Sequence, residues 1–225
     1  MNIDKEKFLF IYEQSQYKTL TESAQSGLIN LLTFMEADEH ITDVRWLAYI
    51  LATTQHEVGG TWQPIREHGS RSYFIGRYGS QTRVGKELGN DTPEEGAIYA
   101  GGGFPQVTGE SNYEMGEAAL RKEYTDVVAR FEARTGSKFD LTVGDQPNDL
   151  SDPENITDPE IAYCIMSYAM RKGAFTGVGL SKYFNDKKTD PVNARKIVNS
   201  LDCAELIARH YDKFMKIISE SEVKA

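Results

Sequence analysis

The sequence contains few cysteines and no long apolar run. Its two cysteines, Cys164 and Cys203, each lie in an apolar helical pattern, so we expect two buried free thiols rather than a disulfide. Two cysteines alone cannot make a structural zinc site. No apolar stretch is long enough to span a bilayer, so we expect no membrane insertion.

Basic residues are also scarce. The chain has 25 Lys and Arg against 34 Asp and Glu, which gives a formal net charge of −9. This balance argues against a protein that grips a nucleic-acid backbone or adheres to an anionic membrane through a basic face. The first residues, Met1 to Glu6, lack the basic start, the full apolar region and the cleavage site of a signal peptide.

What remains is an ordinary globular composition, with 40% hydrophobic and 26% charged residues in a chain of 225. Apolar residues recur at helical spacing in five segments, which predicts helices over about 20–37, 43–57, 115–133, 158–173 and from 203 onward. The expected N-caps are Thr19 (with Glu22), Thr42 and Asp158, and glycines at 59 and 173 mark expected helix ends.

The middle of the chain has a different composition. Between Gly59 and Gly109 lie 12 of the 19 glycines, a density that excludes long helices and predicts functional loops with short strands. The polar segment 135–155 is interpreted as a surface excursion. Because the helices on both sides fit one core, we expect a single domain over 1–225. We predict a mainly α-helical fold with a glycine-rich loop and a small β-hairpin region lining a cleft.

Glu57 is the first candidate for chemistry. It lies in the last turn of the helix that Gly59 and Gly60 are predicted to end. The negative end of the helix dipole and apolar neighbours both disfavour a charged carboxylate there, so Glu57 is suited to keep its proton and act as a general acid. The alternative is a solvated glutamate at a helix end.

Glu67 is the second candidate. It follows Glu57 beyond the glycine turn, so the chain can fold back and present both acids across one cleft. The adjacent Arg66 and His68 would favour its ionised form. One protonated and one ionised carboxyl group form the pair that glycosidic-bond cleavage requires. The alternative is that Glu67 only pairs with Arg66 on a surface loop, and Glu110 and Glu95 are the next candidates for a base.

A third element follows in 101–113. Three consecutive glycines allow the backbone to approach a ligand closely. If the next residues are extended, Gln106 and Thr108 lie on one face, where an amide can bind sugar groups and a hydroxyl can position a water molecule. The alternative is an ordinary turn followed by a strand.

The sequence does not contain the residue spacings of other common catalytic motifs. The chain has no His-Glu-x-x-His zinc motif, no phosphate loop and no Gly-x-Ser-x-Gly nucleophile turn. Zinc held by His56, Glu57, Glu67 and His68 is the alternative metal site that the sequence offers, and we expect neither a metal nor an organic cofactor. Trp62, Tyr73, Phe74 and Tyr78 are candidates for stacking on sugar faces, with at least half of them expected in the core.

In this order and at these separations, the three elements resemble glycoside hydrolase family 19, which holds chitinases and many phage endolysins. The resemblance covers about 28–218, is strongest over 47–67, and extends at 175–181 to the endolysin branch. It implies a lysozyme-like, family 19 chitinase-like α-helical domain. It also implies that Glu57 is the general acid, that His56 lines the cleft, and that Glu67 is the general base.

The resemblance further implies the remaining site residues. Thr108 would help to hold the attacking water, while Gln106, Asn112 and Tyr113 would lie against the sugar. The segment 193–199 would line the far side of the cleft, where Asn199 and Arg195 would touch the substrate. Gly102 and Pro105 depart from the arginine and the aliphatic residue that the family often has there.

The expected function is therefore that of an endolysin, a bacteriolytic hydrolase that cleaves β-1,4 bonds in peptidoglycan glycan strands with inversion. We expect a monomer with no separate wall-binding module, held in the host cytoplasm until the membrane is breached. A chitinase acting on chitin oligomers is the alternative. A non-catalytic glycan-binding protein and a metal-dependent wall amidase are alternatives of other classes.

Overall fold

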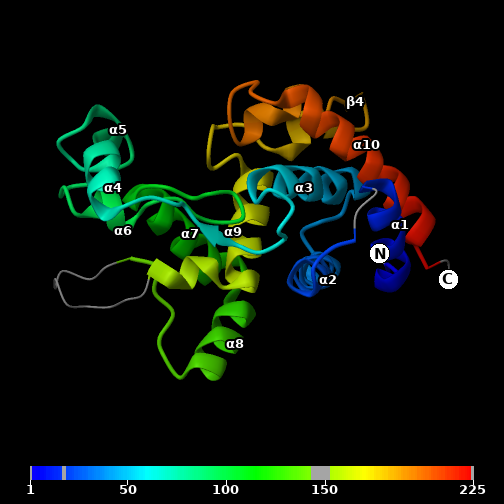
Figure 1. The fold of residues 1–225 in the computed structure, drawn as a ribbon, viewed down its shortest axis with the longest axis horizontal. Coiled ribbons are helices and arrows are strands. Elements are labelled where there is room, and N and C mark those ends of the chain that lie inside the picture. Colours follow the sequence, from blue (N-terminus) through cyan, green and yellow to red (C-terminus); the bar gives the residue numbers. More distant parts are fainter. Residues whose placement is uncertain (1, 17–18, 143–152, 224–225) are drawn as a thin grey trace. The chain divides into compact units, whose positions relative to one another are not determined.

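The computed structural model describes residues 2–16, 19–142 and 153–223 and shows a mainly α-helical fold with two small two-stranded sheets (Figure 1). This confirms the expected fold class. The chain divides into two compact units, residues 1–63 with 167–225 and residues 64–166. The boundary at 166 falls within helix α9 (Pro159–Lys172). A single catalytic domain over the whole chain stays a prediction.

The first unit is built around helix α3 (Val44–Glu57). Every residue from Leu47 to Thr54 is buried, because α3 is covered on more than the single apolar stripe that its sequence suggested. Helix α10 (Ala204–Ser221) packs along both α3 and α1 (Lys5–Gln16), and α2 (Glu22–Ala37) lies against α1 (Figure 1). Burial of these helix faces is the main source of stability for the unit.

Aromatic rings fill the core between α1 and α10. The ring of Phe214 stacks on Phe8 and Tyr12, with centroids 6.2 and 5.7 Å apart, and meets Trp62 edge-on at 5.9 Å. Trp62 is fully buried and has a left-handed backbone, with φ of 58°. Its carbonyl oxygen approaches Gly27 of α2 so closely that a Cβ there would lie 2.1 Å away, so only glycine fits.

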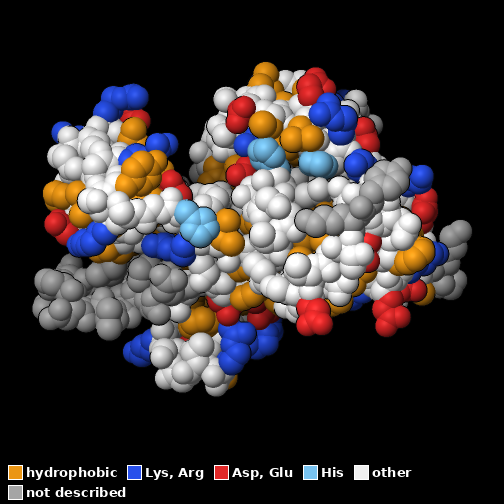
Figure 2. All heavy atoms as spheres, in the orientation of Figure 1, with side chains coloured by type: hydrophobic (Ala, Val, Ile, Leu, Met, Phe, Trp, Pro, Cys, Tyr) orange, Lys and Arg blue, Asp and Glu red, His pale blue; other side chains and the backbone are white. Residues whose placement is uncertain are grey.

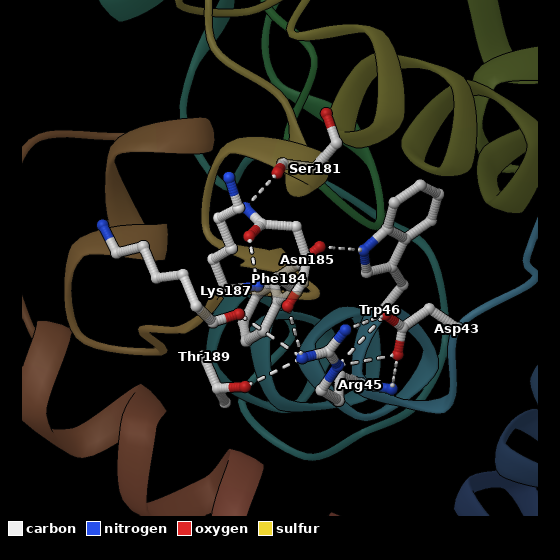
Figure 3. Close-up of polar contacts among 9 residues, drawn as sticks. Asp43, Arg45, Trp46, Ser181, Phe184, Asn185, Lys187 and Thr189 are labelled. Carbon is white, nitrogen blue, oxygen red and sulfur yellow. Dashed lines mark hydrogen bonds and ion pairs between the residues drawn. The ribbon is translucent and has the colours of Figure 1, made fainter.

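A polar cluster joins the start of α3 to the hairpin of β3 (Phe184–Asn185) and β4 (Lys188–Thr189), as Figure 3 shows. Arg45 forms a bidentate ion pair with the Asp43 carboxylate. It also donates to the carbonyl oxygen of Asn185 at 3.1 Å and to the hydroxyl of Thr189 at 2.9 Å. Trp46 donates its indole N–H to the Phe184 carbonyl at 3.3 Å. These bonds satisfy the donors of Arg45 within the protein and fix the hairpin on α3.

The second unit consists of short elements followed by two longer helices. Its elements are β1 (Ile65–Arg66), α4 (Arg71–Tyr78), α5 (Arg83–Glu87), α6 (Glu95–Ile98), β2 (Gly102–Gly103), α7 (Glu110–Glu123), α8 (Thr125–Thr135) and the 3-10 helix η1 (Pro153–Thr157). Strands β1 and β2 pair antiparallel, with Ile65 opposite Gly103. Phe74, Tyr78 and Ala100 form a small core under α4, with Leu88 and Ala97 against it.

Several sequence-based expectations about elements were wrong. The helix predicted over 115–133 is two helices, α7 and α8, which break at the buried Tyr124 with φ of −132° and ψ of 45°. Thr21 and Asp43, rather than Thr19 and Thr42, cap α2 and α3. Asp158 does cap α9, since its carboxylate accepts from the backbone N–H groups of residues 160 and 161.

Two further expectations need correction. Cys164 is a buried free thiol as predicted, but Cys203 is exposed, because it precedes α10 in a left-handed conformation (φ 56°) instead of lying inside the helix. In the supposed surface excursion, Phe139 and Leu141 are fully buried, and residues 143–152 lie outside the described residues. Among the helices that the structure describes, none has the length and apolar character needed to cross a membrane.

Candidate functional site

Glu57 is the last residue of α3, as the sequence predicted. The helix ends there because Gly59 and Gly60 both have positive φ, 58° and 74°, and turn the chain away from the helix axis. The N–H of Gly60 closes this turn on the carbonyl of Gln55 at 3.0 Å. The Glu57 side chain is only 18% exposed, so it lies in a partly dehydrated position at the negative end of a buried helix.

Arg195 is the partner of Glu57. It belongs to the 3-10 helix η3 (Asn193–Ile197), and its Nη1 donates to Glu57 Oε1 at 2.6 Å while its Nε donates to the Asp202 carbonyl at 3.0 Å. The arginine side chain is 3% exposed. This contact is a charge-assisted hydrogen bond between two largely buried side chains. With so little exposed surface, Arg195 contacts the carboxylate rather than offering its guanidinium to a sugar.

The other two predicted residues of the first unit lie nearer the surface. His56 is partly buried and Asn199 is exposed, with the Asn199 N–H bonded to the Arg195 carbonyl at 3.0 Å. His210 of α10 belongs to the same neighbourhood as His56. Burial, followed by the charges of Lys213, His56 and Arg209, lowers the pKa of His210 below its ordinary value of 6.5. We therefore expect a neutral imidazole at position 210 at neutral pH.

Glu67 follows β1 in the second unit, and its side chain is held by neutral donors. Its backbone N–H bonds to the Gly101 carbonyl at 2.7 Å. The Tyr78 hydroxyl lies 3.1 and 3.2 Å from the two carboxylate oxygens, and the Gly101 N–H donates to Oε2 at 3.3 Å. A Cβ at Gly101 would lie 3.1 Å from Glu67 Oε2, so this close approach of backbone to carboxylate depends on glycine.

Arg66 does not pair with Glu67, so the alternative of a simple surface ion pair is wrong. Neighbouring residues in extended backbone point to opposite sides, and the Arg66 guanidinium is turned inward. It donates to the carbonyl oxygens of Ile98 at 2.8 Å and Ala100 at 3.0 Å and to the Tyr113 hydroxyl. The cation next to Glu67 in sequence therefore stabilises the backbone of the glycine-rich loop.

The segment after the three glycines is a turn, not the extended strand that we expected. Gln106 has a left-handed backbone (φ 54°), and Val107 returns to pair with Gly102. The Gln106 Nε2 donates to the carbonyls of Ile65 at 3.0 Å and Gly103 at 3.1 Å. Both amide hydrogens are thus used within the loop, which leaves only the Gln106 side-chain oxygen for a sugar.

Thr108 and Asn112 continue this turn into α7. The Thr108 hydroxyl donates to the Gln106 carbonyl at 3.0 Å, and Asn112 Nδ2 donates to the Thr108 carbonyl at 2.7 Å. Both side chains are partly buried. Because its only hydrogen is engaged, the Thr108 hydroxyl is left with acceptor lone pairs, which can receive a hydrogen bond from a water molecule.

The aromatic candidates divide between core and surface. Tyr113 is fully buried and its hydroxyl donates to the Ala100 carbonyl at 3.0 Å, so the expectation that it lies against the sugar was wrong. Trp62, Phe74 and Tyr78 are also buried, which confirms that at least half of the stacking candidates are core residues. Tyr73 is 46% exposed and is the one member of that group with its ring at the surface.

Glu110, the reserve candidate for a base, has an unusual environment. Burial raises the pKa of its carboxyl to about 7, and the negative charges of Glu95, Glu114 and Asp91 add to the effect. A carboxyl group with a pKa of about 7 is about half protonated at neutral pH, so it is less available as a base than a fully ionised carboxylate. Within the described ranges, no group of three or more His, Cys, Asp or Glu side chains is arranged to hold a metal ion.

Comparison with known proteins gives little further information. No family model and no curated protein matches the chain. Among solved structures, the chain is similar to the crystal structure of a mutant of chitinase C, with 15% sequence identity, a TM-score of 0.49, and coverage of 96% of this chain and 92% of that one. A similarity this weak carries no inference about what the present chain binds or cleaves.

Two residues of the candidate site were not predicted in their roles. Arg195 reaches Glu57 across 138 positions of sequence, and Tyr78 reaches Glu67 across 11. Neither contact has a local sequence signal. Tyr78 was visible only as one of several aromatic residues in the glycine-rich region, and only the fold shows that its hydroxyl faces a carboxylate.

Proposed function

We propose that this protein is a glycoside hydrolase that cleaves β-1,4 bonds between the N-acetylated sugars of peptidoglycan, with Glu57 as general acid and Glu67 as general base. The biological role that we propose is that of an endolysin, which opens the cell wall of a bacterial host. The proposal rests on the chemistry of each carboxyl group and on the order of the motifs that carry them.

The environment of Glu67 carries the proposal. A general base must be ionised, yet its charge must stay available to take a proton from water. A hydroxyl and a backbone N–H stabilise the ionised carboxylate without neutralising it, unlike a lysine or an arginine. Glu67 has such neutral donors in Tyr78 and Gly101, and its basic neighbour Arg66 is engaged elsewhere. This arrangement favours a base over a structural ion pair.

Thr108 fits the role of water holder in this proposal. Its hydroxyl hydrogen is given to the Gln106 carbonyl, so the oxygen is an acceptor for the second hydrogen of a water whose first hydrogen goes to Glu67. The nucleophilic oxygen of that water then attacks the anomeric carbon as Glu67 removes a proton. No step in this scheme uses a metal or an organic cofactor.

Glu57 would protonate the leaving oxygen. For this it must carry a proton when the sugar is bound, and the hydrogen bond from Arg195 to Oε1 leaves the second carboxyl oxygen to carry that proton. An inverting reaction needs the two carboxyl groups about 6.5–9.5 Å apart, and a retaining one about 5–5.5 Å.

The test compares the bonds that the purified protein breaks. Peptidoglycan sacculi and chitin oligomers are incubated with the wild-type protein, and new reducing ends and new amines are counted separately. The proposal predicts new reducing ends from peptidoglycan, no new amines, and no loss of activity with a chelator. New amines without reducing ends would identify an amidase or peptidase, cleavage of chitin alone would identify a chitinase, and binding without either product would identify a glycan-binding protein.

A further inference from the structure

Helix α4 presents a preorganised cation at the surface of the second unit. The Arg77 Nη1 donates to the Tyr73 hydroxyl at 3.0 Å, and the guanidinium carbon lies 5.8 Å from the Tyr73 ring centroid and 5.3 Å from that of Tyr78. Tyr73 and Arg77 are both exposed, whereas Tyr78 is buried beneath them. Two aromatic rings therefore hold the guanidinium in one place while its remaining N–H groups face solvent.

Arg77 differs in its partners from three other exposed arginines, Arg83, Arg121 and Arg130. Arg83 pairs with Glu87 at 2.9 Å, Arg121 with Glu117 at 2.8 Å, and Arg130 with two acids. Within the described residues, no carboxylate forms an ion pair with Arg77. A fixed guanidinium without an internal anion is available for an anion brought by a ligand, to which it can donate two parallel hydrogen bonds.

The surrounding segment is basic in a chain that is acidic overall. Basic residues outnumber acidic ones between positions 66 and 88, while the formal net charge of the whole chain is −9. The basic residues there are Arg66, Arg71, Arg77, Arg83 and Lys86, and the acidic ones are Glu67 and Glu87. Figure 2 shows Lys and Arg side chains spread among apolar ones over α4 and α5. Such a local excess attracts anions.

The cation lies next to the proposed base through one shared residue. Tyr78 contacts Arg77 with its ring and Glu67 with its hydroxyl. A glycan placed with one bond at Glu67 would therefore bring a neighbouring part of the polymer to α4. The exposed Tyr73 ring offers an apolar face of the kind on which a pyranose can stack.

We propose that Tyr73 and Arg77 form a subsite that selects glycans bearing carboxylate groups, with the Arg77 guanidinium binding a carboxylate and the Tyr73 ring binding an adjacent sugar face. This rests on the proposed function, which places a glycan at Glu67. Peptidoglycan carries such carboxylates on its peptide substituents, and on the lactyl group wherever no peptide is attached, whereas chitin has none. Arg77 is thus a specificity-determining residue that does not take part in proton transfer.

The test uses one polymer in two charge states. Sacculi are prepared with native carboxylates or with those carboxylates converted to amides, and both binding by co-sedimentation and release of reducing ends are measured. The proteins are the wild type, Arg77→Gln, Arg77→Lys and the control Arg83→Gln, which alters an exposed arginine of the same basic segment that already pairs with Glu87. Thermal unfolding of each variant confirms that it folds.

We expect Arg77→Gln to bind native sacculi about tenfold more weakly, the loss expected of one charge-assisted hydrogen bond, with Arg77→Lys between the two. Amidation should weaken wild-type binding by the same factor and leave Arg77→Gln unchanged. For Arg77→Gln acting on native sacculi, KM should rise while kcat stays near its wild-type value. The control should behave as wild type on both polymers.

Two outcomes would overturn the inference. One is Arg77→Gln matching Arg83→Gln on native sacculi. The other is that amidation weakens the binding of the wild type and of Arg77→Gln equally, because another part of the protein would then bind the carboxylate. The amidated polymer tests the wild type without any substitution, so a variant that fails to fold does not block the result. If the wild type releases reducing ends but Arg77→Gln behaves like it, only the proposed subsite is refuted. If Arg77→Gln binds more weakly but no protein releases reducing ends, only the proposed hydrolase activity is refuted.

Discussion

Replacing Tyr78 with phenylalanine tests how Glu67 is held. The Tyr78→Phe change removes one oxygen, which lies 3.1 and 3.2 Å from the two Glu67 oxygens, and keeps the ring in its core against Phe74. A hydrogen bond to a charged acceptor contributes about 1.5–3 kcal/mol. Because Glu67 is partly exposed, water replaces some of that bond, and we take the low end, about 1.5 kcal/mol, which is roughly tenfold in rate.

The loss should appear in kcat. Without the Tyr78 hydroxyl, the Gly101 N–H remains as the donor that holds the Glu67 carboxylate, so the base is positioned less well toward a water molecule. We therefore expect kcat to fall about tenfold while KM and the fold are retained.

The matched control is Tyr12→Phe, which removes the hydroxyl of another buried tyrosine, packed against Phe214 and Trp62 in the other unit. It should lower stability without lowering kcat. If Tyr78→Phe leaves kcat unchanged, or raises KM instead, the Tyr78 hydroxyl does not position the Glu67 carboxylate and the reasoning fails.

Three other predictions follow from the site. Gly101→Ala places a Cβ 3.1 Å from Glu67 Oε2, so kcat should fall about tenfold with KM and fold retained, and an unchanged kcat would show that the carboxylate can move freely. Burial raises the pKa of Glu110 to about 7, so the stability linked to this group is lost as pH rises through 7. Glu110→Gln should therefore raise Tm more at pH 8 than at pH 4.5, and a constant difference in Tm would contradict this. Arg195→Met leaves Glu57 without its cation and should lower the free energy of unfolding by about 3 kcal/mol in a denaturant titration, part of which Glu57→Gln should restore.

The sequence predicted the long helices because their apolar spacing is regular and their ends carry clear signals. Both Gly59 and Gly60, at the end of α3, adopt the positive φ that glycine permits, and this places Glu57 at a helix end. The short helix α4 was missed, since eight residues with a glycine at position 76 give too little periodicity to separate from loop.

The contacts that define the chemistry could not be predicted in the same way. The expectation of an extended strand at Gln106 failed because a left-handed backbone at a non-glycine residue leaves no mark in the composition. The direction of Arg66 away from Glu67, and the buried approach of Arg195 to Glu57, depend on tertiary packing between distant segments. The sequence therefore offers both candidate carboxyl groups, but it does not predict the side chains that contact them.

The most direct test of the central claim is the rate of reducing-end release from peptidoglycan by the wild type, Glu57→Gln and Glu67→Gln at one pH and equal protein concentration. Both substitutions keep the size of the side chain and remove its ability to exchange a proton. The account predicts that each variant binds sacculi as the wild type does and loses on the order of 10²-fold or more in turnover. Near-normal turnover by Glu67→Gln would contradict the assignment of the base, and near-normal turnover by Glu57→Gln would contradict that of the acid.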